Sequence, residues 1–271
     1  MTVRHLFCSI VFLMLLHPLS AKGASGDTRE GHAAISVPIL LYHRFGPVVA
    51  DSMTVTTKVF EWQMKYLRDN GYAVIPLRQL VDYLLRKGPP PPPRSVVITS
   101  DDGHKSVYTD MFPLMKKYRY PVTLFIYPSA ISNASYAMTW DQIREIEKSG
   151  LMDVKSHAYW HPNFKKEKKR LKPAEYEQFV DMQLKKSKDK LEKELGGHVD
   201  MLAWPFGIND DELVRKAREA GYSAAFTIER RHVTDADNVM KLPRYIMVNA
   251  DQGKTFERLL SWHTVPGKIA Y

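Results

Sequence analysis

Short apolar runs alternate with segments of helical spacing along most of the chain. The apolar runs are nearly continuous, which is typical of strands buried on both faces of a parallel sheet. Between them, apolar residues recur as on one face of a helix: Phe60, Met64 and Leu67 precede a stop at Gly71. The predicted strands are 37–42, 73–77, 95–99, 121–127, 152–156, 201–205, 223–228 and 244–248. The predicted helices are 57–71, 77–87, 107–119, 141–150, 173–195, 210–221 and 255–262.

This alternation predicts an α/β domain over residues 35–271, in which helices cover a parallel sheet. About seven strands in roughly 230 residues favour a (β/α) barrel, distorted or incomplete, over an open sheet. The chain shows no internal repeat and no further domain boundary. In such a barrel the chemistry lies at the carboxyl ends of the strands, so catalytic residues are expected there.

The first 24 residues follow a different pattern. Arg4 and His5 precede an apolar run from Leu6 to Leu16, and small residues follow it. A basic start, a short apolar middle and a small-residue end are typical of a secretory signal peptide. We therefore predict a signal peptide over residues 1–24 and a secreted or periplasmic protein; a retained membrane anchor is the alternative. The single cysteine, Cys8, lies in this segment, so no disulfide is expected after cleavage.

Composition and charge narrow the class of partner. Of the 271 residues, 44% are hydrophobic and 25% are charged, which is ordinary for a globular protein. The net charge is +9, with basic blocks at 165–172 and 185–190. These blocks favour either a patch for an anionic polymer or a solvated helix face with glutamates interspersed. No nucleic-acid motif accompanies them, so no nucleic-acid partner is expected. The prolines at 89–93 predict a stiff connection, or else a polyproline ligand.

Chemically active side chains gather where three predicted strands end. Asp101 and Asp102 follow the strand at 95–99, His157 and His161 follow the strand at 152–156, and His43 follows the first strand. The carboxyl ends of parallel strands share one edge of a sheet, so these groups are expected close together.

A divalent cation would explain two adjacent carboxylates at the end of a buried strand, because like charges there repel one another. Two histidines and one aspartate make a three-ligand site with open positions, which is the catalytic kind. Each motif alone is weak, since Asp-Asp-Gly is common in loops and His-x-x-x-His occurs by chance. The prediction of a metal site rests on the combination of these motifs at three strand ends. Such ligands suit zinc, cobalt, nickel or iron, and affinity order alone does not choose among them.

The motifs resemble those of the polysaccharide deacetylases, the family 4 carbohydrate esterases. Residues 99–103, Thr-Ser-Asp-Asp-Gly, resemble the family's Thr-Phe-Asp-Asp-Gly, and residues 156–161 match its Ser/Thr-His-x-x-x-His. The resemblance spans residues 37–262 and implies the seven-stranded, distorted barrel known as the NodB-like fold. It is closest to the circularly permuted poly-β-1,6-N-acetylglucosamine deacetylases of biofilm operons. The permuted motifs match at 41–44 (Leu-Tyr-His-Arg), 203–207 (Ala-Trp-Pro-Phe-Gly) and 242–244 (Leu-Pro-Arg).

The resemblance implies a role for each matched residue. Asp102, His157 and His161 would hold the metal, with zinc as the first choice. Asp101 would be the general base that takes a proton from the attacking water. His43 would be the general acid that protonates the departing amine, because an amide nitrogen leaves poorly unless it is protonated.

The chain also departs from the family pattern. Ser100 replaces the usual phenylalanine, and the turn at 202–207 lacks the arginine that orients the base in common family members. Arg244 is a candidate for that task or for substrate binding; a surface ion pair is the alternative. Trp204 and Phe206 are candidate substrate-binding residues for a sugar ring, with core packing as the alternative. His104 receives no role.

The resemblance, together with the predicted metal site, implies a metal-dependent N-deacetylase that acts on an N-acetylglucosamine polymer, with poly-β-1,6-N-acetylglucosamine as the leading substrate. Peptidoglycan and chitin oligomers are the alternative substrates. A non-catalytic carbohydrate-binding protein and a small-molecule amidase are the rival functions, and the intact Asp101 speaks against a pure binder. No obligate protein partner is evident, and association with a membrane or cell wall is left open.

Overall fold

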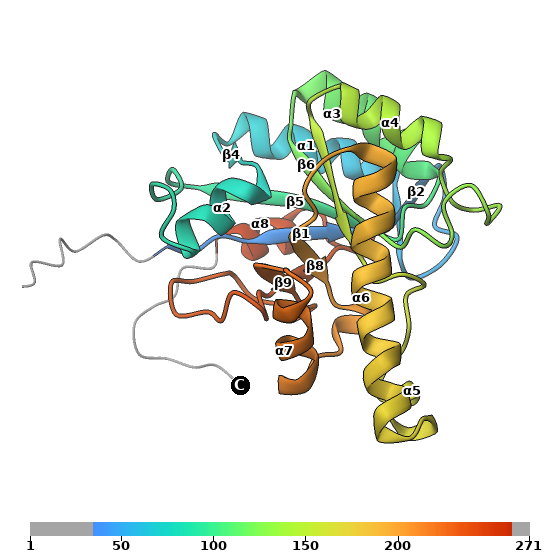
Figure 1. Ribbon diagram of the computed structural model, residues 1–271. Coiled ribbons are helices and arrows are strands. Elements are labelled where there is room, and N and C mark those ends of the chain that lie inside the picture. The colour runs from blue at the N-terminus through green and yellow to red at the C-terminus, as the bar shows by residue number, and fades with distance from the viewer. Residues whose placement is uncertain (1–34, 262–271) are drawn as a thin grey trace, which may run out of the picture. The chain divides into compact units, whose positions relative to one another are not determined.

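A parallel sheet forms the centre of the part of the chain that this computed structural model describes, residues 35–261 (Figure 1). Its seven principal strands lie in the order β10-β1-β5-β6-β7-β8-β9, and every neighbouring pair is parallel. The predicted signal peptide lies outside the described residues. The strands are β1 (Ile39–Tyr42), β5 (Ser95–Asp101), β6 (Val122–Ile126), β7 (Met152–Ser156), β8 (Met201–Ala203), β9 (Ala224–Phe226) and β10 (Tyr245–Ile246).

The sheet curls so that its two edges approach one another. Phe226 at the end of β9 bridges to Leu242, and Thr227 N donates to the Leu242 carbonyl at 2.7 Å. Only a few residues later, Tyr245 of β10 pairs with Leu40 of β1. The segment from Leu242 to β10 therefore contacts both edges, and the predicted incomplete (β/α) barrel is confirmed. Three short strands lie outside the principal order: β4 (Ala73–Val74) pairs with β5, and β2 (Arg44–Gly46) pairs with β3 (Thr54–Thr56).

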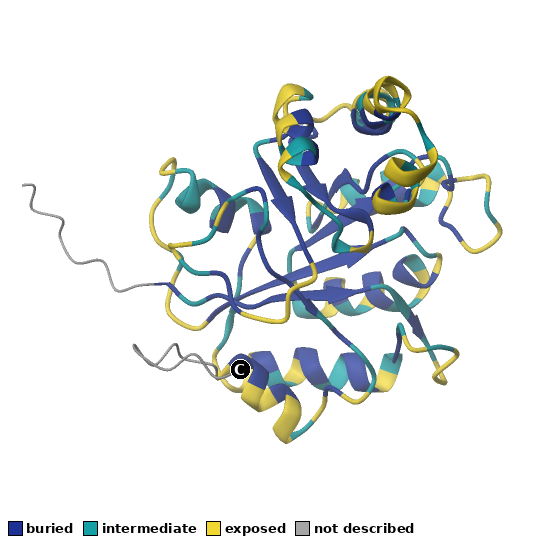
Figure 2. Cartoon of the chain, turned by 90° about the horizontal axis from the view of Figure 1, so that it is seen from below, coloured by how far each residue is buried: buried dark blue, intermediate teal, exposed yellow. Residues whose placement is uncertain are grey.

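Helices surround the sheet and bury their apolar stripes against it (Figure 2). In α1, the predicted stripe of Phe60, Met64 and Leu67 has no exposed surface. Thr56 caps this helix, because its side chain accepts a hydrogen bond from Val59 N. The helices are α1 (Thr57–Asp69), α2 (Leu77–Leu84), α3 (Phe112–Tyr118), α4 (Trp140–Lys148), α5 (Phe164–Arg170), α6 (Pro173–Leu195), α7 (Asp211–Glu219) and α8 (Lys254–Leu260), with a π-helical turn η1 (Val107–Met111) and a 3₁₀ turn η2 (Pro205–Gly207).

The structure differs from the predicted elements at two places that affect the site. The strand predicted at 73–77 ends at Val74, because Pro76 stands at the N-cap of α2 and Leu77 begins that helix. The strand predicted at 95–99 continues to Asp101, which is therefore a strand residue and not a loop residue. A charged residue in a buried strand needs a partner, and the structure provides one, described below.

Helix α5 was not predicted, because its only buried apolar residue is Phe164 and the rest of it is lysine, arginine and glutamate. Its cations are partly neutralised: Lys168 lies 2.8 Å from carboxylate oxygens of both Asp210 and Glu212. In α6, Lys190 pairs with Glu194 at 2.7 Å. The basic blocks thus resemble solvated helix faces with interspersed acids. Within residues 35–261, no helix combines the length and apolar character needed to cross a membrane.

Candidate active site

The predicted site residues meet at the carboxyl edge of the sheet. Asp101 ends β5 and Asp102 follows it, while His157 directly follows β7. Since β5 and β7 both border β6, their carboxyl ends lie close together. His157 Nε2 is 3.6 Å from Asp101 Oδ2 and 3.7 Å from Asp102 Oδ1, and His161 Nε2 is 3.8 Å from the same Asp102 oxygen.

Left-handed backbone conformations concentrate around this edge. Neighbouring side chains of an extended strand point to opposite faces, so Asp101 and Asp102 can share one site only if the chain leaves the strand between them. It does so through a positive φ at Asp102, a conformation that costs a non-glycine residue about 1–2 kcal/mol. The non-glycine residues with positive φ near the site are Asp102 (74°), Ala158 (60°), His161 (59°) and Phe206 (57°).

Gly103 completes the turn after the two aspartates. Its φ is 73°, and an added Cβ would lie 3.0 Å from Ile131 Cδ1 and 3.1 Å from Ile126 Cγ2. Only glycine combines this backbone conformation with such a close approach at no steric cost. Asp102 and Gly103 therefore form a turn in which close packing against Ile126 and Ile131 requires glycine at the second position.

Asp102, His157 and His161 fit a metal ion by three independent observations. One ligand atom from each lies within 4.8 Å of the other two. Asp102 Oδ1 is buried and has no hydrogen-bond partner among the described residues. Burial raises the pKa of Asp102 and the charge of Asp101 adds to the rise, while His43, Arg44 and Arg244 oppose it. The donor set of two imidazoles and one carboxylate suits a first-row divalent metal.

The two histidines are in the form that ligates metals. His157 Nδ1 lies 2.8 Å from the Ala203 carbonyl; as donor there, it leaves the lone pair of Nε2 directed at Asp102. Burial lowers the pKa of His157 to about 3. Burial also lowers the pKa of His161. Both imidazoles are therefore neutral at pH 7 and available as ligands.

Asp101 is engaged differently from Asp102. Both of its oxygens accept hydrogen bonds from Arg244, at 2.8 Å to Nη1 and 2.8 Å to Nη2. Burial alone would raise the pKa of Asp101, but the groups around it, Arg244 foremost, together outweigh burial and hold that pKa below its usual range. Asp101 is thus ionised and firmly oriented, whereas the free oxygen of Asp102 is the one left for a cation.

Arg244 is itself held from several sides. Its side chain is 0% exposed, and Nε donates to the Thr227 carbonyl at 3.0 Å. The guanidinium lies over the rings of Phe125 and Phe226, at 5.3 and 5.9 Å from their centroids. Its complete burial corrects two of the expectations for Arg244, the surface ion pair and the direct contact with substrate. Its position is that of a residue that orients Asp101.

Replacing Arg244 by alanine is expected to lower the free energy of unfolding by about 3–5 kcal/mol, because it leaves the buried Asp101 carboxylate unpaired. Urea unfolding followed by circular dichroism measures this loss. Arg215→Ala is the matched control: Arg215 pairs with Glu219 on the surface of α7, with side chains 53% and 49% exposed. Its loss should cost far less, because water screens an exposed ion pair. Equal destabilisation by the two variants would show that the Arg244 pair has no special role.

His43 follows β1, next to the strand that carries Asp101. Its Nδ1 is buried and has no hydrogen-bond partner among the described residues. Burial lowers the pKa of His43, while the charges of Asp101 and Asp102 oppose that shift. The imidazole therefore lies within electrostatic reach of both carboxylates.

A cavity of about 300 Å³ opens beside Asp102. Most of its lining residues were not predicted from the sequence. Tyr127 could have been found, because it follows the carboxyl end of β6, and Arg44 follows His43 directly. Tyr136 gives no such signal: it lies in the loop after β6, and its hydroxyl meets the Tyr127 hydroxyl at 2.7 Å. The cavity is lined by Arg44, Asp102, His104, Tyr127 and Tyr136.

The two aromatic residues of the turn after β8 behave differently from one another. Trp204 has no exposed surface, and its Nε1 donates to the Met240 carbonyl at 2.9 Å. This corrects the expectation that Trp204 contacts a sugar; it packs in the core. Phe206 is 53% exposed, and its ring centroid lies 4.5 Å from that of His161. Phe206 therefore remains a candidate for substrate contact.

The barrel and the acid–histidine site at its carboxyl edge define the class of protein. A family model described as polysaccharide deacetylase matches residues 88–225, from just before β5 to β9. The chain belongs to the polysaccharide deacetylase family and is a polysaccharide N-deacetylase. This membership favours an enzyme over the rival interpretation as a non-catalytic binder.

Two curated relatives indicate which branch of the family the chain resembles. It is 28% identical over 201 residues to a poly-beta-1,6-N-acetyl-D-glucosamine N-deacetylase of Staphylococcus epidermidis, covering 72% of this chain and 68% of that protein. It is 27% identical over 211 residues to the protein of the same name from Staphylococcus aureus (strain MRSA252), covering 76% of this chain and 71% of the relative.

Solved structures share the fold. The deacetylase PplD of Streptococcus pyogenes, in complex with acetate, superposes with a TM-score of 0.75 at 21% identity, over 84% of this chain and 99% of that one. IcaB from Ammonifex degensii superposes with a TM-score of 0.71 at 25% identity, over 84% of this chain and 96% of that one. The incomplete barrel is therefore that of known deacetylases.

Proposed function

We propose that this protein removes N-acetyl groups from poly-β-1,6-N-acetylglucosamine with the help of a divalent metal held by Asp102, His157 and His161. The observation that carries the proposal is the unpartnered Asp102 Oδ1, buried between the Nε2 atoms of two neutral histidines and beside the Asp101–Arg244 pair. The names of the staphylococcal relatives support the choice of polymer.

A divalent cation bound there would supply a Lewis acid for the acetamide carbonyl and would lower the pKa of a water molecule. The proton transfers are carried out by side chains of the protein. Asp101 is kept ionised by Arg244, so it accepts a proton from the attacking water. His43 follows β1, and in its protonated form, which the charges of Asp101 and Asp102 favour, it donates a proton to the departing amine nitrogen. Arg244 is a positioning residue, since it reaches the reaction only through Asp101.

Zinc is the first choice of metal, because two imidazoles and a carboxylate with open positions form a common catalytic zinc site. Cobalt, nickel and iron accept the same ligands. Metal analysis of the purified protein, followed by reloading of the chelated protein with each ion, distinguishes them.

The rim of the site suits an extended glycan. Two of the large apolar side chains that are exposed within residues 35–261 lie at the site: Tyr136 lines the cavity and Phe206 contacts His161, while the others follow β2, β7 and β9 along the chain. Aromatic rings among them offer flat apolar surface for the faces of sugar rings. A surface rim of this kind fits a polymer that passes over the site. The exposed residues are Val48, Val49, Tyr136, Trp160, Phe206 and Ile228.

The location of the polymer agrees with the predicted signal peptide over residues 1–24. An exopolysaccharide lies outside the cytoplasm, so we propose a secreted or periplasmic enzyme. Detection of the mature N-terminus by mass spectrometry of the protein from a secreting host would test cleavage.

The deciding experiment is acetate release from a β-1,6-N-acetylglucosamine oligomer by the metal-loaded protein. Release that stops on chelation and returns with added metal is the expected result. Peptidoglycan fragments and chitin oligomers are assayed in parallel as the alternative substrates. Acetate release from one of these, with none from the β-1,6 oligomer, would replace the proposed substrate. Release that survives complete removal of metal would overturn the metal-dependent mechanism.

A further inference from the structure

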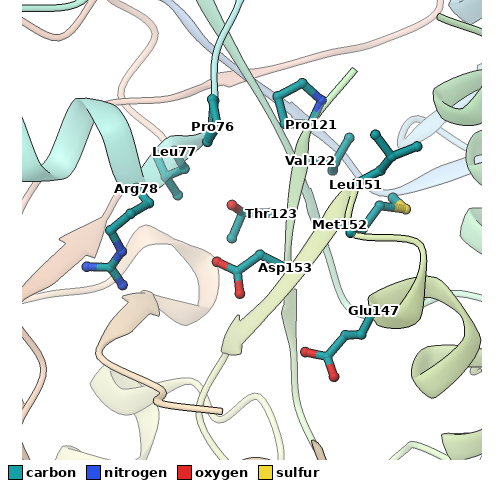
Figure 3. A pocket seen from close by; sticks show the side chains of 11 residues that line it. Pro76, Leu77, Arg78, Pro121, Val122, Thr123, Glu147, Leu151, Met152 and Asp153 are labelled. Carbon is teal, nitrogen blue, oxygen red and sulfur yellow. The ribbon is translucent and has the colours of Figure 1, made fainter. Parts of the chain in front are cut away.

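A second cavity, of about 370 Å³, lies at the opposite edge of the sheet (Figure 3). It lies beside Val122 and Met152, the first residues of β6 and β7, and beside the start of α2. The five-residue strand β7 separates it from His157, which is roughly 16 Å at about 3.3 Å per residue. The cavity is therefore distinct from the candidate active site.

The cavity carries a carboxylate without a direct partner; Lys155 opposes the rise of its pKa but is itself paired with Asp153. Glu147 forms no ion pair and no side-chain hydrogen bond with any described residue, although it lines the cavity. Burial, and then the nearby charge of Asp153, raise the pKa of Glu147 to about 7. Asp153, on the facing wall, pairs only with Lys155, at 3.0 Å. Figure 3 shows both carboxylates beside the open space.

The one cation that lines the cavity, among the described residues, is already engaged. Arg78 binds both oxygens of Asp200, with Nη1 at 2.9 Å from Oδ2, and lies 3.8 Å from Asp82. Its charge is therefore balanced by carboxylates outside the cavity. The Glu147 side of the cavity stays net negative and attracts a cation.

Thr123 provides an independent sign of a ligand. It lines the cavity from β6, is 3% exposed, and its hydroxyl has no hydrogen-bond partner among the described residues. Figure 3 shows its side chain between Leu77 and Asp153, facing the space. This hydroxyl is not among the fully buried unsatisfied atoms of the described residues, so it reaches the cavity and is available to donate to or accept from a ligand there.

The remaining walls decide what kind of cation fits. They are apolar over most of their extent, so an organic group is favoured over a bare ion. Within residues 35–261, the only cluster of three or more metal-ligating side chains is the one at Asp102, so Glu147 and Asp153 lack a third such ligand. A primary ammonium group donates three hydrogen bonds, which suits two carboxylates and a hydroxyl. The apolar walls come from Pro76, Leu77, Pro121, Val122, Leu151 and Met152.

We propose that this cavity is a second binding site, which takes the primary ammonium group of a small ligand between Glu147, Asp153 and Thr123. The ammonium group that fits this enzyme is that of the glucosamine unit produced by deacetylation. This part of the proposal rests on the proposed function. N-acetylglucosamine lacks the ammonium group and is rejected. The site would thus hold the product polymer on the face opposite the reaction.

The test is an NMR titration of the protein with glucosamine, and with N-acetylglucosamine as the neutral control of the same ring. Glucosamine should shift the amide signals of Thr123 and Gly150, and N-acetylglucosamine should not. Glu147→Gln should weaken glucosamine binding about tenfold or more, since it removes a charged hydrogen-bond partner. It should leave acetate release unchanged. Thr123→Val is a second variant, which removes the hydroxyl at nearly constant volume.

Asp102→Ala separates this site from the active site, because it should abolish acetate release and keep the glucosamine shifts at Thr123 and Gly150. Equal shifts with both sugars, or undiminished binding by Glu147→Gln, would overturn the ammonium site. A titration with putrescine tests whether the site takes other amines. Shifts with putrescine and none with glucosamine would show that the ligand is not the deacetylated product. The shifts are read without turnover, so failure of the deacetylase assay does not affect them.

Discussion

Replacing Asp102 by alanine is expected to abolish metal binding and acetate release together. The variant removes the one carboxylate oxygen that lies 3.7 and 3.8 Å from the two histidine Nε2 atoms and has no other described partner. Two neutral imidazoles alone hold a divalent ion weakly, since no ligand then offsets its charge. Loss of Lewis-acid help worth about 4 kcal/mol lowers the rate about a thousandfold. Metal content per chain and acetate release, measured on one preparation, check this.

Asp141→Ala is the matched control for that variant. Asp141 lies on α4, its side chain is 91% exposed, and it pairs with Arg144. It should keep both metal and activity. His157→Ala should behave as Asp102→Ala does. Full metal content in Asp102→Ala would show that the ion is held elsewhere, and the site at the carboxyl edge would then be misassigned.

Replacing Asp101 by asparagine should separate binding from chemistry. The amide nearly preserves the shape of the carboxylate but accepts no proton, so turnover should fall about 10²–10⁴-fold while metal stays bound. The KM should change little, because Asp101 is 2% exposed and is expected to contact the attacking water more than the sugar. Metal content, kcat and KM are measured separately to show this split.

The stability of the Asp101→Asn variant is measured as well, because a neutral amide at this position leaves the buried Arg244 without its anion. Assays are run at a temperature where circular dichroism shows the variant to be folded. Asp141→Asn is the isosteric control on the surface. Turnover equal to that of the parent would show that Asp101 is not the base, and loss of metal would show that it is a ligand.

The two aspartates show how far sequence reasoning reaches. Their adjacency at the end of an apolar run indicated a cation, but spacing alone left open which of the two would bind it. The structure distinguishes them by their surroundings. Arg244 occupies both oxygens of Asp101, and Oδ1 of Asp102 has no described partner. Arg244 and Asp101 lie 143 positions apart in the chain, so no local pattern could pair them.

Trp204 is a residue whose position was predicted wrongly from the sequence. Its place after a strand end suggested a sugar contact, yet it is fully buried, while Phe206 two residues later is exposed. Which of two nearby aromatic side chains faces solvent depends on the positive φ at Phe206 and on the packing of Trp204 beside Met240. Hydrophobic periodicity carries no information about such a turn.

The sequence predicts the incomplete parallel barrel and the strand ends at which the polar groups gather. It could do so because both follow from local periodicity and from one general property, that parallel strands end at a shared edge. The tertiary structure alone decided the Asp101–Arg244 pair, the burial of Trp204, the tyrosine walls of the active-site cavity and the unpaired Glu147 at the opposite edge. Each of these depends on which distant segments the strand order brings together and on how burial changes the cost of a charge, and neither quantity is local in the chain.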